Sequence, residues 1–130
     1  CTLKSLQIDN FYTKVLRKYI TPIFKYVWHY PWQARDMITE DFIAKYSLDA
    51  QTALKIHNDE SWLSMTVTLN NNFKGGGTSF PRQNTHIKLP TGYAVIHPSK
   101  ITHPHGGLPV TEGVRYIIVS FTKGVTGTNK

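Results

Sequence analysis

Apolar and polar residues follow two different periods along this chain, and the period changes near residue 40. Between residues 9 and 30 apolar positions recur every three or four residues, which is the spacing of one face of an α-helix. We expect Asp9-Asn10 to cap this helix and Pro22 to kink or divide it. The helix should lie across one face of a sheet. Its apolar stripe consists of Tyr12, Val15, Leu16, Tyr19, Ile20, Ile23, Phe24 and Val27.

From Asp41 onward the chain breaks into short runs that are typical of strands. Leu63, Met65, Val67 and Leu69 alternate with polar residues, the two-residue period of a strand with one buried face. Stretches rich in Asn, Pro and Gly separate the runs. One helix followed by many short strands predicts a mainly β (α+β) fold, a barrel or double-sheet jelly roll with a helical brace. The predicted strands are 42–46, 54–57, 63–70, 86–89, 93–97 and 114–121.

Length and composition narrow the class of protein. The 130 residues predict one domain, with a helical brace at about 9–30 and a β core at about 41–122. Because the chain starts at Cys1, we expect it to be the C-terminal part of a longer protein. A single cysteine excludes an internal disulfide. We find no apolar run of membrane-spanning length and no signal peptide.

The net charge of +7 indicates either an ordinary solvated basic surface or a surface that attracts an acidic partner. No basic run is interleaved with aromatic residues, so we predict no nucleic-acid partner.

Two histidines and one aspartate form a candidate metal site. His57 and Asp59 are two positions apart, so on an extended backbone their side chains point the same way. A third ligand must come from a distant strand, and His105 is well placed for it. A lone histidine is more often a hydrogen-bonded core or surface residue, and a His-x-Asp pair is weak evidence by itself. Two imidazoles and one carboxylate can occupy one face of an iron(II) ion and leave the opposite positions open.

Arg115 adds specificity to this pattern. It lies inside an apolar strand and shares a face with Ile117, Val119 and Phe121. A buried guanidinium needs an anion, which is either a structural carboxylate or the distal carboxylate of 2-oxoglutarate. Tyr46 either adds a hydroxyl to the same pocket or packs in the core. We expect the apolar alternation in 63–69 and 114–121 to keep this pocket dry. A metal beside an anionic co-substrate is typical of an oxygenase that uses 2-oxoglutarate.

Three motifs resemble known hydroxylases over about residues 42–122. The first two are similar to the catalytic domain of procollagen lysyl hydroxylases. The third, Gly76-Gly77-Thr78-x-Phe80-Pro81, resembles prolyl 4-hydroxylases more closely. The first motif comprises Tyr46, Asp49, Gln51, Leu54, His57 and Asp59; the second comprises His97-Pro98, Thr102-His103, His105, Gly107-Leu108-Pro109, Thr111, Gly113, Arg115-Tyr116-Ile117 and Val119-Ser120-Phe121.

The resemblance implies a double-stranded β-helix, the cupin-like jelly roll, and a defined set of site residues. His57, Asp59 and His105 would bind Fe(II), and no catalytic residue beyond these ligands is implied. The cofactors would be Fe(II), 2-oxoglutarate, O2 and ascorbate. His103 matches a histidine that is common in lysyl hydroxylases, and we expect a supporting role for it. The residues expected to bind 2-oxoglutarate are Arg115, Tyr46 and Thr78, the last of which stands where lysyl hydroxylases usually carry Cys.

The leading hypothesis is a dioxygenase that hydroxylates a peptidyl lysine, with a collagen-like protein as its partner. The alternatives are peptidyl proline or another protein side chain, or a metal-binding jelly roll without catalysis. A zinc hydrolase would leave Arg115 unexplained. The enzyme would act in the endoplasmic reticulum if it modifies collagen, and in the cytoplasm otherwise.

Substrate choice should reside in the loops 34–41 and 70–77. A lysyl substrate would favour Asp36, Glu40, Asp41 or Glu60, and a prolyl substrate Trp32 or Trp62.

Overall fold

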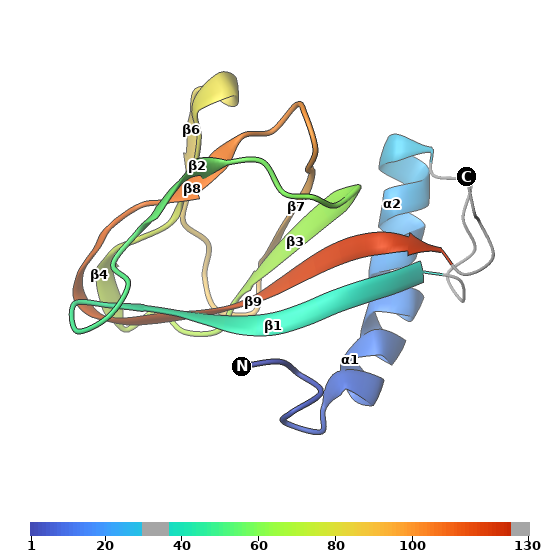
Figure 1. The fold of residues 1–130 in the computed structure, drawn as a ribbon, viewed down its shortest axis with the longest axis horizontal. Coiled ribbons are helices and arrows are strands. Elements are labelled where there is room, and N and C mark those ends of the chain that lie inside the picture. Colours follow the sequence, from blue (N-terminus) through green and yellow to red (C-terminus); the bar gives the residue numbers. More distant parts are fainter. Residues whose placement is uncertain (30–36, 126–130) are drawn as a thin grey trace.

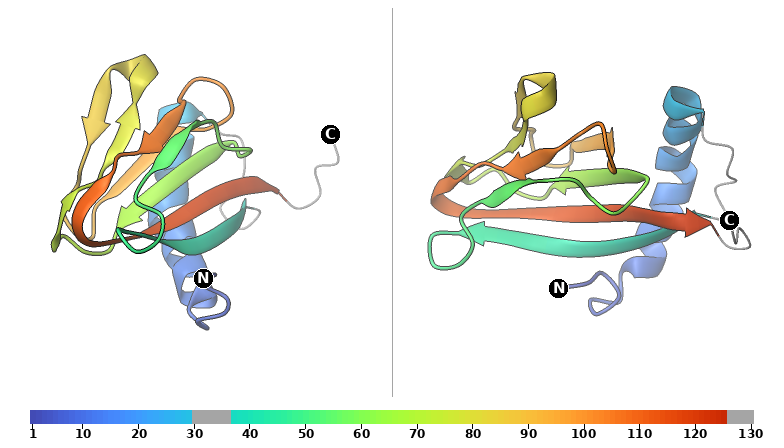
Figure 2. Two further views of the ribbon diagram at one scale, coloured as in Figure 1. Left: turned by 60° about the vertical axis from the view of Figure 1, so that its left-hand side comes forward. Right: turned by 45° about the horizontal axis from the view of Figure 1, so that its top comes forward.

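The computed structural model describes residues 1–29 and 37–125 (Figure 1). The chain begins with one long helical segment and continues as antiparallel strands. These strands form two sheets that face each other, and the helical segment crosses one end of the long strands (Figures 1 and 2). The predicted mainly β jelly roll with a helical brace is therefore confirmed.

The larger sheet contains the longest strands and supplies the base of the cavity described below. Its order is β1 (Met37–Ser47), β9 (Val110–Val125), β3 (Leu63–Thr68) and β7 (Ala94–Pro98), and β4 (Phe73–Gly75) also pairs with β9. The smaller sheet has the order β2 (Leu54–His57), β8 (His105–Gly107), β5 (Thr78–Phe80) and β6 (Thr85–Ile87), and the short helix η3 (Pro81–Gln83) joins the last two.

All six predicted strands exist, the strand 54–57 with the predicted bounds and the other five with different ones, and three further strands in the described residues were missed. β1 and β9 are longer than predicted because they pair with each other from Met37↔Val125 to Ser47↔Val114. β4, β5 and β8 were not predicted, since each is only three residues long. Such short runs carry no readable periodicity, and only their neighbours in the sheets define them as strands.

The helical segment is divided near Pro22, as predicted. α1 (Asp9–Val15) leads into a π-helical turn, η1 (Leu16–Ile20), and then into α2 (Thr21–Trp28), whose first turn contains Pro22. Proline has no N–H to donate to the preceding turn, so the helix widens before it. The predicted cap is wrong: Ile8 holds the cap position without a side-chain hydrogen bond, and Asp9 lies in the first turn. None of the helices in the described residues is long and apolar enough to cross a membrane.

The two faces of β3 have different roles. Leu63 and Met65 pack against Leu16 and Phe24, so the helix covers the outer face of the larger sheet. The alternate residues of β3 face the space between the sheets, where Ser64 lines the cavity. This corrects the expectation that the apolar residues of 63–69 keep the pocket dry, because they face the helix instead.

The apolar inner wall comes from β9 and β1. Ile117, Val119 and Phe121 line the cavity from β9, as the sequence predicted, and Phe42 does so from β1. The rings of Phe42 and Phe121 meet edge to face with centroids 5.5 Å apart. On the outer face, the Tyr12 hydroxyl lies 2.8 Å from that of Ser120, and burial raises the pKa of Tyr12 to about 12.

Candidate metal centre and anion pocket

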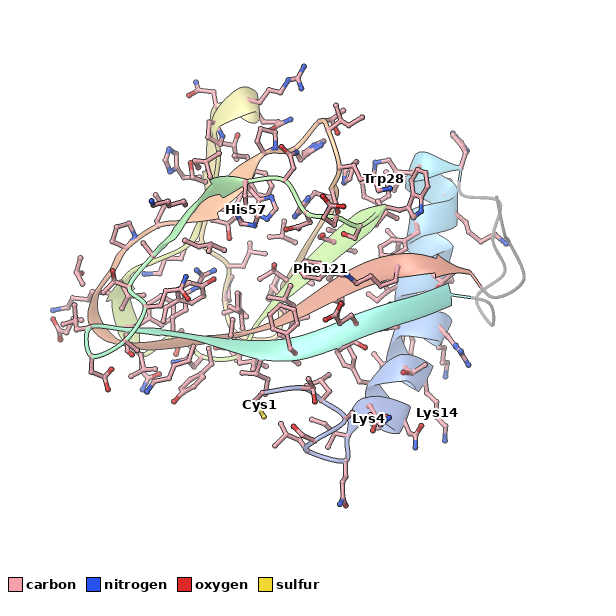
Figure 3. All side chains as sticks on the ribbon, in the orientation of Figure 1. Cys1, Lys4, Lys14, Trp28, His57 and Phe121 are labelled. Carbon is pink, nitrogen blue, oxygen red and sulfur yellow. The ribbon has the colours of Figure 1, made fainter. Side chains whose placement is uncertain are left out.

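The fold brings His57, Asp59 and His105 to one point. His57 ends β2 and pairs directly with His105 at the start of β8, while Asp59 follows two residues after His57. The candidate ligand atoms of the three side chains all lie within 4.8 Å of one another. The imidazole of His57 projects from β2 into the space between the sheets (Figure 3). Asp59 is buried, and both histidines are partly buried.

The hydrogen bonds of the two histidines direct their Nε2 atoms toward Asp59. His57 Nδ1 lies 2.7 Å from the Lys55 carbonyl oxygen, and His105 Nδ1 lies 3.0 Å from the carbonyl oxygen of His103. A carbonyl only accepts, so each Nδ1 carries a proton, and Nε2 is the ring nitrogen that points at Asp59.

Those Nε2 atoms lie 3.1 Å (His57) and 3.4 Å (His105) from the two carboxylate oxygens of Asp59. The His57 Nε2 to Asp59 Oδ1 distance allows a hydrogen bond, and the same three side chains can instead hold a cation between their donor atoms. The donor set therefore fits a divalent first-row metal ion.

Aromatic rings hold His105 in place. The ring of His97 lies 4.5 Å from that of His105, and the ring of Phe80 lies 5.6 Å from it. Burial lowers the pKa of His97 to about 4, so this imidazole is neutral at physiological pH. His103 stacks on His97 at 6.0 Å and contributes its carbonyl to His105. This arrangement fits the supporting role that we expected for His103.

One cavity contains all the predicted site residues. It lies between the sheets, and Tyr46, Thr78 and Arg115 line it beside the three candidate ligands. Tyr46 on β1 is the direct neighbour of Arg115 on β9, because the register of the two strands pairs them. The sequence interpretation placed these side chains in one pocket, and the structure brings them together.

Arg115 is a buried cation that pairs with no carboxylate in the described part of the chain. It is 5% exposed, and its Nη1 donates to the Gly77 carbonyl oxygen at 3.1 Å while Nη2 lies 3.5 Å from Thr78 Oγ1. Within residues 1–29 and 37–125 no carboxylate forms an ion pair with it. Burial lowers the pKa of Arg115, whose guanidinium nevertheless stays charged in proteins, and raises the pKa of Tyr46, so the Tyr46 hydroxyl keeps its proton at neutral pH. A guanidinium has five N–H donors, and this one can accept an anionic ligand.

The expected substrate loops look different in the structure. The segment 70–77 includes β4, and the Asn70 side chain donates to the Val114 carbonyl at 2.6 Å and accepts from the Tyr116 N–H at 2.7 Å. Segment 70–77 is thus fastened to β9 and is not a free loop. Residues 34–36 lie outside the described residues, and 37–41 belong to β1.

Of the residues proposed to meet the substrate, Trp32 and Asp36 lie outside the described part of the chain. Glu40 forms an ion pair with Lys123 at 2.9 Å. Asp41 lies by the helix, on the side away from the cavity, where it accepts from the Thr39 hydroxyl at 2.8 Å.

Glu60 and Trp62 are exposed and follow Asp59 closely in the chain. The Trp62 ring has Lys100 Nζ 4.4 Å from its centroid. Glu60 is therefore the acidic candidate best placed near the metal site.

Sequence reasoning missed three buried serines beside Asp59. Ser61, Ser64 and Ser99 are each at most 2% exposed and connect to the Asp59 carboxylate through hydrogen bonds. A signal for Ser64 was present, because it occupies a polar position in the alternation of β3. Ser99 is distant in sequence and could only be found from the fold.

The comparisons with known proteins agree with this geometry. The sequence is 36% identical over 123 residues to human procollagen-lysine,2-oxoglutarate 5-dioxygenase 2, an alignment that covers 92% of this chain and 17% of that protein. It is 33% identical over 124 residues to the multifunctional procollagen lysine hydroxylase and glycosyltransferase LH3 of rat. That alignment covers 92% of this chain and 16% of the rat protein. The chain thus spans about a sixth of the length of these relatives. No known family profile matches it.

The fold itself has a close counterpart among solved structures. A viral collagen prolyl hydroxylase from Paramecium bursaria Chlorella virus 1, solved as a 2OG complex, superposes with a TM-score of 0.65 over 88% of this chain and 73% of that chain. At 20% identity this similarity establishes the jelly-roll fold alone. The resemblance seen in the sequence is confirmed, and along 92% of its length this chain is homologous to the procollagen-lysine 2-oxoglutarate 5-dioxygenases.

Proposed function

We propose that this chain is the catalytic domain of an Fe(II)- and 2-oxoglutarate-dependent dioxygenase that hydroxylates a peptidyl lysine in collagen-like sequences. One observation carries the proposal. The donor set His57, Asp59 and His105 shares a cavity with Arg115, a buried cation that has no carboxylate partner among the described residues. A metal-binding module without catalysis would not need that cation.

His57, Asp59 and His105 would hold the iron, which when bound supplies dioxygen activation for C–H hydroxylation coupled to oxidative decarboxylation of 2-oxoglutarate. The role of ascorbate would be to return oxidised iron to Fe(II). The two Nδ1–H groups donate to backbone carbonyls, which keeps both rings oriented.

Arg115 would bind the distal carboxylate of 2-oxoglutarate through N–H groups that no carboxylate among the described residues occupies. Thr78 and Tyr46 both neighbour the guanidinium: Nη2 lies 3.5 Å from Thr78 Oγ1, and Cζ lies 5.4 Å from the Tyr46 ring centroid. The raised pKa of Tyr46 keeps its hydroxyl protonated, so it can donate to the same anion. Ile117 and Val119 exclude water from the space between this anion site and the metal site.

Lysine is the favoured target because the curated relatives are named as lysine hydroxylases and align with almost the whole chain. Glu60 offers a carboxylate that could meet a substrate ammonium group, and it forms no ion pair with another described residue. Proline is the second candidate, because the segment from Gly76 to Pro81 resembles prolyl 4-hydroxylases.

The test is mass spectrometry of two matched collagen-like peptides, one with lysine and one with proline at the target position. Each is incubated with the chain, Fe(II), ascorbate and 2-oxoglutarate. We expect the lysyl peptide to gain one oxygen on lysine, with an equal amount of succinate. Asp59→Ala should abolish both products because it removes a ligand. Hydroxylation of proline alone would reject lysine as the target. Metal binding without succinate formation with either peptide would reject the proposed dioxygenase activity.

A further inference from the structure

Three buried hydroxyl groups form a hydrogen-bonded chain that ends on Asp59. Ser99 Oγ donates to Ser64 Oγ at 2.7 Å, and Ser64 Oγ donates to Asp59 Oδ2 at 2.6 Å. Ser61 Oγ lies 2.9 Å from Ser64 Oγ. The exposed fractions of Ser61, Ser64 and Ser99 are 1%, 2% and 0%. This serine chain, Ser61-Ser64-Ser99, connects the segment after β2 with β3 and with the end of β7.

The chain has a single direction. A hydroxyl has one proton and two lone pairs. The Ser64 proton goes to the Asp59 carboxylate, since an ionised acceptor forms the stronger bond. Both lone pairs of Ser64 are then available for protons from Ser99 and Ser61, so Ser61 must be a donor as well. Hydrogen bonds in series polarise one another, in agreement with the short contact of 2.6 Å.

The two oxygens of Asp59 consequently differ. Oδ2 accepts the Ser64 hydroxyl and lies 3.4 Å from His105 Nε2, whereas Oδ1 lies 3.1 Å from His57 Nε2 and accepts from none of the three serines. The Asn58 side chain, next to Asp59, donates to the Ser99 carbonyl at 3.1 Å and ties the two segments together. The carboxylate is therefore held from one side by an extensive buried network.

We propose that the serine chain is a positioning device for Asp59, which fixes the carboxylate orientation and engages Oδ2 so that Oδ1 alone is presented to the metal. A carboxylate that bound through both oxygens would take a coordination position that 2-oxoglutarate or dioxygen needs. Ser64 is a positioning residue, since it acts through Asp59. The inference rests on the metal centre of the proposed function. It adds a supporting network of hydrogen bonds, which the identity of the three ligands does not predict.

The test compares Co(II) binding by the 130-residue chain and its variants. Co(II) is stable in air, and its visible absorption weakens as its coordination number rises. In Ser64→Ala we expect affinity for Co(II) to fall about 10–100-fold, the usual effect of losing a group that orients a metal ligand. The visible bands of bound Co(II) should also weaken, because the released carboxylate can bind through both oxygens. Ser64→Thr keeps the hydroxyl and should restore affinity and spectrum.

Ser120→Ala is the matched control. Ser120 is 4% exposed, and its hydroxyl lies 2.8 Å from that of Tyr12 instead of near Asp59, so its loss should leave Co(II) binding unchanged. If Ser64→Ala does not fold, as judged by circular dichroism, Ser99→Ala tests the same chain with Ser64 in place. It should give a smaller loss of affinity in the same direction.

Four results would overturn the inference. Unchanged affinity and spectrum in Ser64→Ala would do so while leaving the metal centre intact. If Ser64→Ala does not fold, unchanged Co(II) binding in Ser99→Ala would also overturn the inference. An equal loss in Ser120→Ala would show that the effect is general destabilisation. If the unsubstituted chain did not bind Co(II), the proposed metal centre would fail, and this inference would fail with it.

Discussion

Among the individual residues, Arg115 has the environment that is hardest to explain without a ligand. A buried guanidinium normally pairs with a carboxylate, because the loss of hydration is otherwise uncompensated. Here the neighbours are a carbonyl oxygen of Gly77, the hydroxyl of Thr78 and the ring of Tyr46. These groups orient the cation without neutralising it, as a site for a dicarboxylate requires.

Replacement of Arg115 by Ala should weaken 2-oxoglutarate binding by about 2–5 kcal/mol, since one partner of a buried charge pair is lost. The Michaelis constant for 2-oxoglutarate, measured by succinate formation, should rise accordingly. Arg115→Lys should recover only part of the loss because an ammonium cannot bind both carboxylate oxygens in the same planar way.

Arg17→Ala is the charge-matched control, since Arg17 is exposed on the helix. The Michaelis constant of Arg17→Ala for 2-oxoglutarate should equal that of the unsubstituted chain. A normal 2-oxoglutarate requirement in Arg115→Ala would show that the anion binds elsewhere.

Among the elements, the glycine turn between β4 and β5 shapes the anion pocket. Gly76 has a φ of +69°, and a Cβ at this position would lie 2.9 Å from Phe73 Cε2 and 3.2 Å from Arg115 Cδ. The turn therefore needs glycine for two reasons, the left-handed backbone and the close approach of the Arg115 side chain.

We expect Gly76→Ala to lower the free energy of unfolding and also to raise the Michaelis constant for 2-oxoglutarate, because the added methyl displaces Phe73 or Arg115. Gly92→Ala provides the matched comparison, with a φ of +87° and no atom within 4 Å of the added Cβ. Both variants should lose about 1–2 kcal/mol from left-handed strain. Urea unfolding and succinate kinetics measure the two effects. Equal behaviour of the two variants would contradict the role of Gly76 in the pocket.

In the whole molecule, the candidate metal centre connects the two sheets. His57 and His105 belong to β2 and β8 of the smaller sheet, and Asp59 is hydrogen-bonded to Ser64 on β3 of the larger one. An ion bound by all three side chains would join the sheets in the folded state only. Metal binding is then coupled to folding.

Addition of Mn(II) should therefore raise the melting temperature. At a free concentration about 100 times the dissociation constant, the stabilisation is about 2.7 kcal/mol by mass action. Differential scanning calorimetry with and without the ion gives the shift. In the Asp59→Asn variant, Mn(II) should raise the melting temperature much less than in the unsubstituted chain. An equal rise in both would show that the ion binds elsewhere on the protein.

The fold class was readable from the sequence wherever an element was long enough to show its period. The helix at 9–30 and the strand at 63–70 are examples, because one face of each is buried against the other. The short strands β4, β5 and β8 could not be predicted, since sheet neighbours and not local preference make them extended. The inward face of β3 was also misjudged, because alternation identifies two faces and does not say which one meets the cavity.

The sequence by itself determined the chemistry of the site, because residue types at fixed spacings specify donors: two imidazoles, a carboxylate and an isolated guanidinium in an apolar strand. The homology confirms the resemblance to lysine hydroxylases, and the assignment of the donors stays a prediction. Only the tertiary structure decided which groups support those donors. The pairing of β2 with β8 sets His57 opposite His105, and the approach of β3 and the end of β7 places Ser64 and Ser99 behind Asp59. Such contacts join residues far apart in the chain, so they depend on how the sheets pack and leave no local pattern in the sequence.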